Sequence, residues 1–318
     1  MSFIRTVLGD IVPQELGVCY AHEHIVIAPS YPTEKSPDFL LDDVDLITRE
    51  LQDLHAAGGR AVVDSMPCDC GRDVLKLAEV SRRSGVHIIA PTGLHLQKYY
   101  PHGHWGEKLS IEELEELWRA DIEEGIDALD YSGPLVKRTP HRAGVIKVAG
   151  GRDVLSKHER KIFTAAARVQ KATGCPILTH CEEGTAGLEQ VQVLAEGGAD
   201  LKHVVLSHMD RNADISAHRQ VLEAGANLEY DSAFRWKTKH NPTLELLIEL
   251  LPQFPHQLML GMDAARRSYW KSFGGSPGLS WLLREFVPQL KERGVSDESI
   301  NRIFVENPAR AYAFAFAR

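Results

Sequence analysis

Eight short apolar runs alternate with amphipathic segments, and this alternation restricts the fold of the chain more than any other feature. The runs begin near Gly17, Arg60, Val86, Gly144, Pro176, His203, Asn227 and Gln257, and segments with helical periodicity include Val44 to Ala56, Asp73 to Arg83, Lys157 to Lys171 and Leu188 to Ala195. Eight strand–helix units are the number that closes a (β/α)8, or TIM, barrel, which commonly occupies more than about 250 residues. No linker divides the chain, so we predict one α/β barrel domain over residues 1–318.

The first apolar run ends in His22-Glu23-His24. Residues i and i+2 of a strand point to the same face, about 7 Å apart at their Cα atoms, so two imidazoles can converge on one metal ion. A histidine pair in a strand is more often an ordinary surface or core feature, and the rest of the chain has to decide between these interpretations. Glu23 should face away from the two histidines, and we assign it no catalytic role.

Four later apolar runs also carry a potential metal ligand, namely Lys147, His180, His208 and Asp263. Each of these residues alone has an ordinary explanation as a solvated or hydrogen-bonded group near the end of a strand. In an α/β barrel, however, the carboxyl ends of all strands meet at one face, where enzymes of this fold build their sites. Together the residues predict a hydrolytic metal site at the C-terminal face of the barrel.

Composition limits the partners and the cellular setting of the protein. The net charge is −8 and no basic run occurs, so nucleic acid is not an expected partner. No stretch approaches about 18 uncharged apolar residues, and the N-terminus lacks the apolar region of an export signal, so we expect no membrane association. Five cysteines without such a signal favour a reducing cytoplasm.

A long aromatic connection, Leu96 to Glu113, follows the third predicted strand. It contains Tyr99-Tyr100-Pro101-His102-Gly103-His104-Trp105. Loops that follow barrel strands often carry function, so the connection could cover a substrate. It could equally be a packed surface loop, and the sequence does not decide between the two.

Several motifs, in the same order along the chain, resemble those of the phosphotriesterase family of the amidohydrolase superfamily. They are Thr6-Val7-Leu8-Gly9-Asp10-Ile11, Ala21-His22-Glu23-His24, Ile146-Lys147-Val148, Thr179-His180, Ser207-His208, Gly261-Met262-Asp263 and Glu306-Asn307-Pro308-Ala309-Arg310. The resemblance covers nearly the whole chain. It implies a distorted (β/α)8 barrel that holds two divalent metal ions.

The resemblance also implies how the metals are held. His22, His24 and Asp263 would bind the more buried ion, and His180 and His208 the more exposed one. Lys147, carboxylated by CO2, would bridge them together with a hydroxide. An unmodified lysine is a cation, so Lys147 suits such a site only as the anionic carbamate. Asp263 would also accept the proton of the hydroxide and pass it to the leaving group.

The segment after the eighth strand, Met262-Asp263-Ala264-Ala265-Arg266-Arg267-Ser268-Tyr269, resembles the branch of the family that contains phosphorylated-sugar lactonases. In that branch an arginine, a tyrosine three residues later and a lysine after the seventh strand bind the substrate phosphate. Arg266, Tyr269 and Lys237 match these positions, with Lys239 as a rival for the lysine. The bland alternative is that these cations only solvate the loops.

We therefore expect a cytoplasmic metal-dependent hydrolase, a lactonase that opens a small phosphorylated sugar lactone. Hydrolysis of a phosphotriester or an apolar lactone at the same centre is the alternative, and a non-catalytic binding barrel is a more distant one. Zn²⁺ is the expected metal, with Mn²⁺, Co²⁺ or Fe²⁺ also suited to these ligands. A homodimer is a possible assembly, but the sequence does not determine it.

Overall fold

The computed structural model describes residues 2–236 and 240–315. Parallel strands form its centre, in a six-stranded sheet of order β11-β10-β9-β8-β7-β6 and a three-stranded sheet of order β3-β4-β5. These strands are β3 (Cys19–Glu23), β4 (Ala61–Asp64), β5 (His87–Ile89), β6 (Pro91–Gly93), β7 (Val145–Gly150), β8 (Ile177–Cys181), β9 (Val204–Ser207), β10 (Asn227–Tyr230) and β11 (Leu258–Leu260). The eight predicted runs all begin within two residues of an observed strand.

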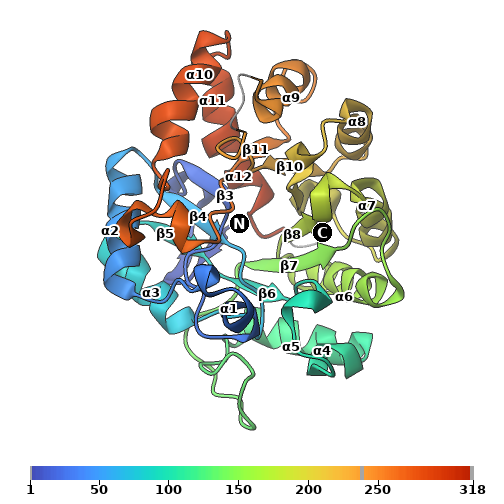
Figure 1. Ribbon diagram of the computed structural model, residues 1–318. Coiled ribbons are helices and arrows are strands. Elements are labelled where there is room, and N and C mark those ends of the chain that lie inside the picture. Colours follow the sequence, from blue (N-terminus) through green and yellow to red (C-terminus); the bar gives the residue numbers. More distant parts are fainter. Residues whose placement is uncertain (1, 237–239, 316–318) are drawn as a thin grey trace.

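Two seams join the sheets into a barrel. Only Ala90 separates β5 from β6, so these strands are the two halves of the third wall strand. At the other seam, the backbone amides of Met262 and Asp263, just after β11, donate to the carbonyl of His22 on β3 at 3.3 and 3.1 Å. The strands thus form a central ring with helices around it (Figure 1). The predicted distorted (β/α)8 barrel is confirmed.

The helices that follow the strands cover the outside of this ring. The longer ones are α2 (Val44–Ala56), α3 (Val74–Ser84), α5 (Ile111–Glu123), α6 (Lys157–Thr173), α7 (Gly187–Glu196), α8 (Ile215–Glu223) and α9 (Pro242–Leu250). After β11 come the π-helical turn η9 (Leu282–Phe286) with α10 (Val287–Glu292), and then α11 (Asp297–Asn301), the π-helical turn η10 (Arg302–Glu306) and α12 (Asn307–Ala311). Two short helices, α1 (Tyr31–Lys35) and α4 (Trp105–Lys108), lie in the connections after β3 and β6.

Single 3-10 turns complete the connections. They are η1 (Pro13–Glu15), η2 (Pro37–Phe39), η3 (Gln97–Tyr99), η4 (Glu182–Gly184), η5 (Leu201–His203), η6 (Met209–Arg211), η7 (Arg267–Tyr269) and η8 (Lys271–Phe273). Four of these turns, η3, η4, η6 and η7, follow wall strands. They contribute loop residues to the C-terminal face of the barrel, where a site is expected.

Local sequence signals explain where the helices begin and end. Ser110 caps α5 and Ser156 caps α6, each paired with a glutamate three residues later in a capping box. Gly85 and Gly174 end α3 and α6 in the left-handed conformation at φ 73°, which a glycine adopts without steric penalty. The predicted segments therefore match α2 fully and differ from α3, α6 and α7 by one or two residues at their ends.

Two apolar layers stabilise the barrel. The larger layer lies between the wall and the helices. The smaller layer draws small and branched side chains from all wall strands except β6 and β10, so it fills the interior of the ring. Tyr312 closes the interior at the N-terminal face of the barrel, and its hydroxyl group donates a hydrogen bond to the carbonyl of Ala21 at 2.7 Å. The interior of the barrel is therefore apolar toward the N-terminal ends of the strands.

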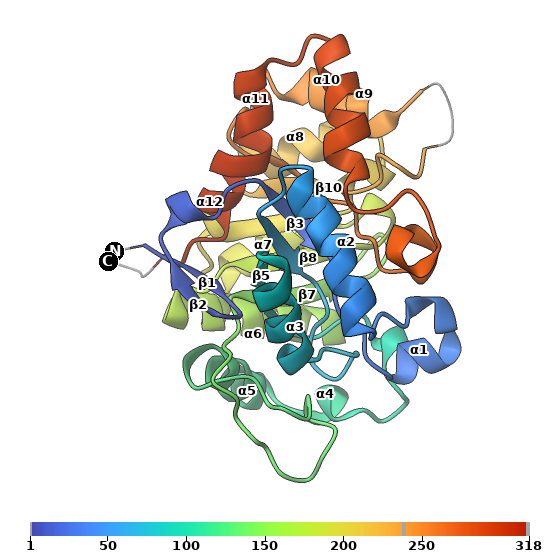
Figure 2. The same ribbon diagram turned by 90° about the vertical axis from the view of Figure 1, so that its left-hand side faces the viewer.

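Both described ends of the chain lie at the N-terminal face of the barrel, opposite the C-terminal face that carries the site. The antiparallel pair β1 (Ile4–Thr6) and β2 (Gly9–Ile11) sits there, and the amide of Phe314 donates to the carbonyl of Phe3 at 2.8 Å. Figure 2 shows these ends on one side of the barrel and α1, with the loop after β11, on the opposite side. Across the described residues, no helix combines the length and the apolar character that a membrane span requires.

Candidate metal centre and substrate pocket

The predicted ligand residues come together at the carboxyl ends of the strands. His22 and His24 lie on or just after β3, Lys147 on β7 and His180 on β8, while His208 and Asp263 follow β9 and β11. His208 and Asp263 have φ values of 67° and 46°, which non-glycine residues seldom adopt. Such backbone strain persists where the surrounding structure enforces it, commonly at functional sites.

One group of three side chains could hold a metal ion. The ligand atoms of His22, His24 and Asp263 all lie within 4.8 Å of one another. Asp263 Oδ1 is 3.2 Å from His24 Nε2 and 3.6 Å from His22 Nε2. The spacing of the two histidines in the sequence therefore does bring their rings to one carboxylate.

The two other histidines lie next to this group. The ring centroid of His208 is 4.7 Å from that of His22 and 4.4 Å from that of His180. A second group that could hold a metal ion consists of His22, His208, Glu229 and Asp231. We did not predict a role for Glu229 or Asp231, although both lie at or just after the end of β10 with the same i, i+2 spacing as His22 and His24.

Lys147 is fully buried, and its Nζ has no hydrogen-bond partner among the described residues. Burial lowers the pKa of its ammonium group to about 8. His22 Nε2 is likewise buried without a partner in the described part of the chain. Buried polar atoms are nearly always satisfied in native proteins, so these atoms indicate a group that this set of side chains is built to bind.

Each of the four histidines has a neighbour at one ring nitrogen. His22 Nδ1 lies 2.7 Å from Ser207 Oγ, and His24 Nδ1 lies 3.3 Å from the sulfur of Met66. His208 Nδ1 lies 2.5 Å from an Asp231 carboxylate oxygen, and His180 Nε2 lies 2.6 Å from Glu182 Oε2. In His22 and His24 the other ring nitrogen, Nε2, lies within 3.6 Å of Asp263 Oδ1, and a partner at one ring nitrogen is typical of histidines that bind metal ions.

Burial also sets the charge state of these rings. It lowers the pKa of His180 to about 4 and the pKa values of His22 and His208 well below 6.5. These imidazoles are therefore neutral at neutral pH, which is the form that binds a metal ion. Neutral imidazoles, buried carboxylates and a lysine with a free Nζ fit a divalent cation.

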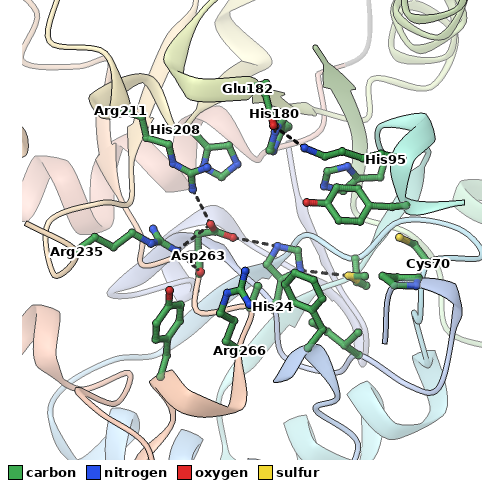
Figure 3. A pocket seen from close by; sticks show the side chains of 18 residues that line it. His24, Cys70, His95, His180, Glu182, His208, Arg211, Arg235, Asp263 and Arg266 are labelled. Atoms are coloured by element: carbon green, nitrogen blue, oxygen red, sulfur yellow. Dashed lines mark hydrogen bonds and ion pairs between the residues drawn. The ribbon is translucent and has the colours of Figure 1, made fainter. Parts of the chain in front are cut away.

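A cavity of about 360 Å³ opens above this cluster (Figure 3). It is lined by His24, Ile27, Pro32, Phe39, Met66, Cys70, His95, Lys98, Tyr99, His180, Glu182, His208, Arg211, Arg235, Asp263, Ala265, Arg266 and Tyr269. The lining thus combines metal-type ligands, cationic side chains and an apolar side. Such a cavity suits a small polar molecule that also carries a carbon skeleton.

Two arginines that we did not predict contact Asp263. Arg211 donates to Asp263 Oδ2 at 2.7 Å, and Arg235 donates to the same oxygen at 3.0 Å and to the Asp263 carbonyl at 2.7 Å (Figure 3). Burial alone would raise the pKa of Asp263, but Arg235, the hydrogen bond to His24 and the charges of His208 and Arg211 hold it well below 3.8. Asp263 is therefore a carboxylate with Oδ1 facing the histidines and Oδ2 facing the arginines.

The predicted phosphate-binding residues are only partly described. Arg266 and Tyr269 line the cavity. The Arg266 guanidinium lies 4.6 Å from the ring centroid of Phe39 and 3.8 Å from a carboxylate oxygen of Asp38, so it is partnered but half-buried. Lys237 and its rival Lys239 lie outside the described residues.

The long connection after β6 has one part that borders the cavity and one part that packs as a surface loop. His95, Lys98 and Tyr99 line the cavity. Tyr100 and His104, by contrast, are buried and stack on each other with ring centroids 4.3 Å apart. The first part of the connection therefore borders the cavity, and its next part packs as an ordinary loop.

Glu23 faces away from the histidine pair, as expected, but it organises the site from behind. Its buried carboxylate accepts hydrogen bonds from the backbone amides of Met262 at 2.7 Å and Ala264 at 3.2 Å. These amides flank Asp263, so Glu23 ties the strand that carries the two histidines to the segment that carries the aspartate. The sequence offers no signal for this contact between residues far apart in the chain.

An α/β barrel with clustered histidines and acidic residues at the C-terminal face, over an apolar core, is an arrangement found in metal-dependent hydrolases. Residues 2–312 match the model of the phosphotriesterase family, so the chain belongs to this family. It is a hydrolase, and the buried His/Asp/Glu group at the upper face is a divalent-metal site.

Individual relatives cover almost the whole chain. A phospho-furanose lactonase of Mycoplasmopsis synoviae is 36% identical over 98% of this chain and 92% of its own length. The phosphotriesterase homology protein of Escherichia coli is 31% identical over 93% of this chain and 98% of its own. Among solved structures, a lactonase from Listeria monocytogenes superimposes with a TM-score of 0.90 at 31% identity, covering 99% of this chain and all of the other.

Proposed function

We propose that this protein is a two-metal lactonase that opens a small phosphorylated sugar lactone. The observation that carries the proposal is that one cavity joins a metal-type cluster around Asp263 to the guanidinium groups of Arg211, Arg235 and Arg266. A similar protein of M. synoviae is named phospho-furanose lactonase, and a structure of the E. coli relative has phosphate in its active site. The chain itself has a net charge of −8, so this concentration of cations is local.

In this proposal, His22, His24 and Asp263 would hold one divalent ion, and His180 and His208 would hold the other. Lys147 would be a further ligand once CO2 has added to its neutral amine and the product has lost a proton to become an anionic carbamate. The lowered pKa of Lys147 supports this step, because only the neutral amine is nucleophilic. Zn²⁺ is the metal we favour for these ligands, with Mn²⁺, Co²⁺ or Fe²⁺ as alternatives.

Two divalent ions at this position would supply Lewis acidity and a hydroxide nucleophile at neutral pH. The side chains perform the remaining tasks. Asp263 Oδ1 takes the proton of the nucleophile as it attacks the lactone carbonyl, and delivers it to the alkoxide that leaves when the ring opens. The low pKa of Asp263 suits this role, because a weak base holds a proton only briefly before passing it on.

The substrate phosphate is bound by Arg266 and Tyr269, together with Lys237 from the loop after β10. Arg266 faces the cavity beside Phe39, and Tyr269 lies with its ring 5.6 Å from the guanidinium carbon of Arg235. A guanidinium group can bind phosphate through two parallel hydrogen bonds. Loops after the last two strands of such barrels frequently hold phosphate, which agrees with the positions of these residues.

A hydrolysis screen with matched substrates tests the proposal. Lactones with and without a terminal phosphate, and one phosphotriester, are compared on wild-type protein and on Arg266→Ala. Loss of a charge-assisted hydrogen bond of about 1.5–3 kcal/mol should reduce kcat/KM for the phosphorylated lactone about 10- to 100-fold, and more if two bonds are lost. The lactone without phosphate should react at an almost unchanged rate.

Arg267→Ala is the matched control, because Arg267 is exposed and does not line the cavity. Lys237→Ala and Lys239→Ala identify which lysine contributes. If Arg266→Ala slows both lactones equally or neither of them, the phosphate pocket is misplaced. The apolar side of the cavity, with Ile27, Phe39 and Met66, would then favour an apolar lactone or a phosphotriester as the substrate.

The wider setting belongs to the same proposal. We infer one catalytic domain in residues 1–318, a cytoplasmic location, and a homodimer as the assembly to be examined first. The five cysteines are buried and unpaired, which agrees with a reducing compartment. Size-exclusion chromatography with light scattering measures the assembly directly.

A further inference from the structure

Glu182 links a proposed metal ligand to the loop after β6. Its Oε2 lies 2.6 Å from His180 Nε2, and its Oε1 accepts a hydrogen bond from Lys98 Nζ at 2.5 Å. His180 is on β8, Glu182 begins η4, and Lys98 belongs to η3 in the connection that follows β6. One carboxylate therefore connects two loops and a histidine at the edge of the cavity (Figure 3).

The contact between Glu182 and His180 determines which ring nitrogen of His180 can bind a metal ion. A neutral imidazole carries one N–H, and a carboxylate beside Nε2 keeps that hydrogen on Nε2. The lone pair then stays on Nδ1, which can bind a cation. The ring is also held at its faces and edges, since its centroid lies 5.0 Å from that of His95 and 4.4 Å from that of His208. Ring orientation and tautomer are thus both fixed.

Glu182 differs from the other carboxylate that supports a histidine here. Asp231, beside His208 Nδ1, has a fully buried side chain and also binds Arg211. The Glu182 side chain is 26% exposed and lines the cavity, and its second partner, Lys98, is 52% exposed. Glu182 is therefore the more exposed of the two supporting carboxylates, and its second partner lies in the loop after β6.

We propose that Glu182 is a positioning residue that presents His180 Nδ1 to the more exposed metal ion, and that Lys98 couples this ion to the loop after β6. The inference rests on the proposed metal site but not on the choice of substrate. Partners of this kind that orient a metal-binding histidine typically change metal affinity about 10- to 100-fold when removed.

Metal affinity of the purified full-length protein tests the proposal. Metal-free wild type, Glu182→Ala and Glu182→Gln are titrated with Zn²⁺, and the dissociation of each ion is followed under challenge by a chromogenic chelator. Glu182→Ala should weaken one of the two ions about 10- to 100-fold and leave the other unchanged. Glu182→Gln keeps an oxygen acceptor, so it should recover part of the affinity.

Glu183→Gln is the matched control, since Glu183 is the neighbouring glutamate, is 59% exposed and pairs with Arg152 instead of a histidine. Nitrogen chemical shifts of the histidine rings report the tautomer: His180 should hold its hydrogen on Nε2 in wild type and become a mixture in Glu182→Ala. Lys98→Met should weaken the same ion less than Glu182→Ala does, and should raise KM more than it lowers kcat.

Three results would overturn the inference. The first is a Glu182→Ala protein that retains both ions with wild-type dissociation rates. The second is an equal loss of both ions in Glu182→Ala and Glu182→Gln together with a lower Tm of the metal-free protein, which would indicate general packing. The third is an unchanged His180 tautomer. Wild-type protein that binds a single ion would contradict the two-metal proposal instead, and the effect of Glu182 on that ion could still be measured.

Discussion

Replacement of Lys147 by methionine should stabilise the metal-free protein while removing the metal centre. The Lys147 side chain is fully buried, and burial lowers its pKa from 10.5 to about 8. At about 1.4 kcal/mol per pKa unit, the buried ammonium group reduces the free energy of unfolding by about 3 kcal/mol at pH 7. Methionine fills a similar volume without a charge, so Lys147→Met should recover up to about this amount.

The pH dependence distinguishes this explanation from a simple change in packing. The unfolded chain keeps the lysine proton up to about pH 10.5, whereas the folded chain releases it near pH 8. Unfolded protein therefore binds more protons between these values, and the stability of the wild type should rise with pH across this window. The advantage of Lys147→Met should be complete below pH 8 and should fade toward pH 10.5.

Urea denaturation of both proteins at pH 7 and pH 10 measures the effect, in CO2-free buffer with a chelator present. Titration with Zn²⁺ in bicarbonate buffer provides the second readout, in which Lys147→Met should no longer bind two ions. The reasoning would be refuted if Lys147→Met were less stable than wild type at pH 7, or if its advantage were the same at both pH values.

Three further predictions follow from buried groups. Glu23→Ala leaves the amide of Ala264 unsatisfied and leaves the amide of Met262 with only its longer bond to the His22 carbonyl at 3.3 Å, so urea denaturation should show a loss of about 1–3 kcal/mol, and an unchanged stability would contradict the contact. Arg72→Met removes the guanidinium group that contacts Asp121 and Asp130 at 2.9 and 2.8 Å; because Asp121 keeps Arg138 at 2.8 Å, the loss in the same assay should lie at the lower end for a broken buried ion pair, about 3 kcal/mol, and a loss below 1 kcal/mol would contradict the role of Arg72. Addition of free Zn²⁺ at about 1,000 times its Kd should raise the free energy of unfolding of the metal-free protein by about 4 kcal/mol per site. An unchanged Tm would argue against tight binding.

The periodic parts of the structure could be predicted from the sequence. Wall strands and helices repeat their apolar residues at fixed intervals, and serine caps and terminal glycines mark helix ends, as at Ser156 and Gly174. The i, i+2 spacing of His22 and His24 predicted two rings on one side of β3, and both rings do approach Asp263. These inferences work because strand geometry, not a loop conformation, sets the spacing.

The same geometric signal was present at β10 and was overlooked there. Glu229 and Asp231 have the i, i+2 spacing, and both belong to the second group of residues that could hold a metal ion. Arg211 and Arg235 differ from these residues, because they lie in loops, where the sequence has no periodic pattern of apolar residues. Their contact with Asp263 depends on how the segments after β9, β10 and β11 are placed in space, which no local pattern encodes.

The distribution of apolar and charged side chains explains why the barrel can fold although the buried charged groups of the site lower its stability. Below the cluster, apolar side chains from most of the wall strands fill the interior, and this layer supplies stability at a distance from the cavity. Above it, burial opposes the charged form of Lys147 and of the neighbouring carboxyl group of Glu229. Divalent ions would relieve this strain, since they place positive charge among these groups and require a neutral or carboxylated lysine. The side chains that weaken the metal-free fold are therefore the ones that give the centre its affinity, and substitutions that stabilise the empty barrel should weaken metal binding.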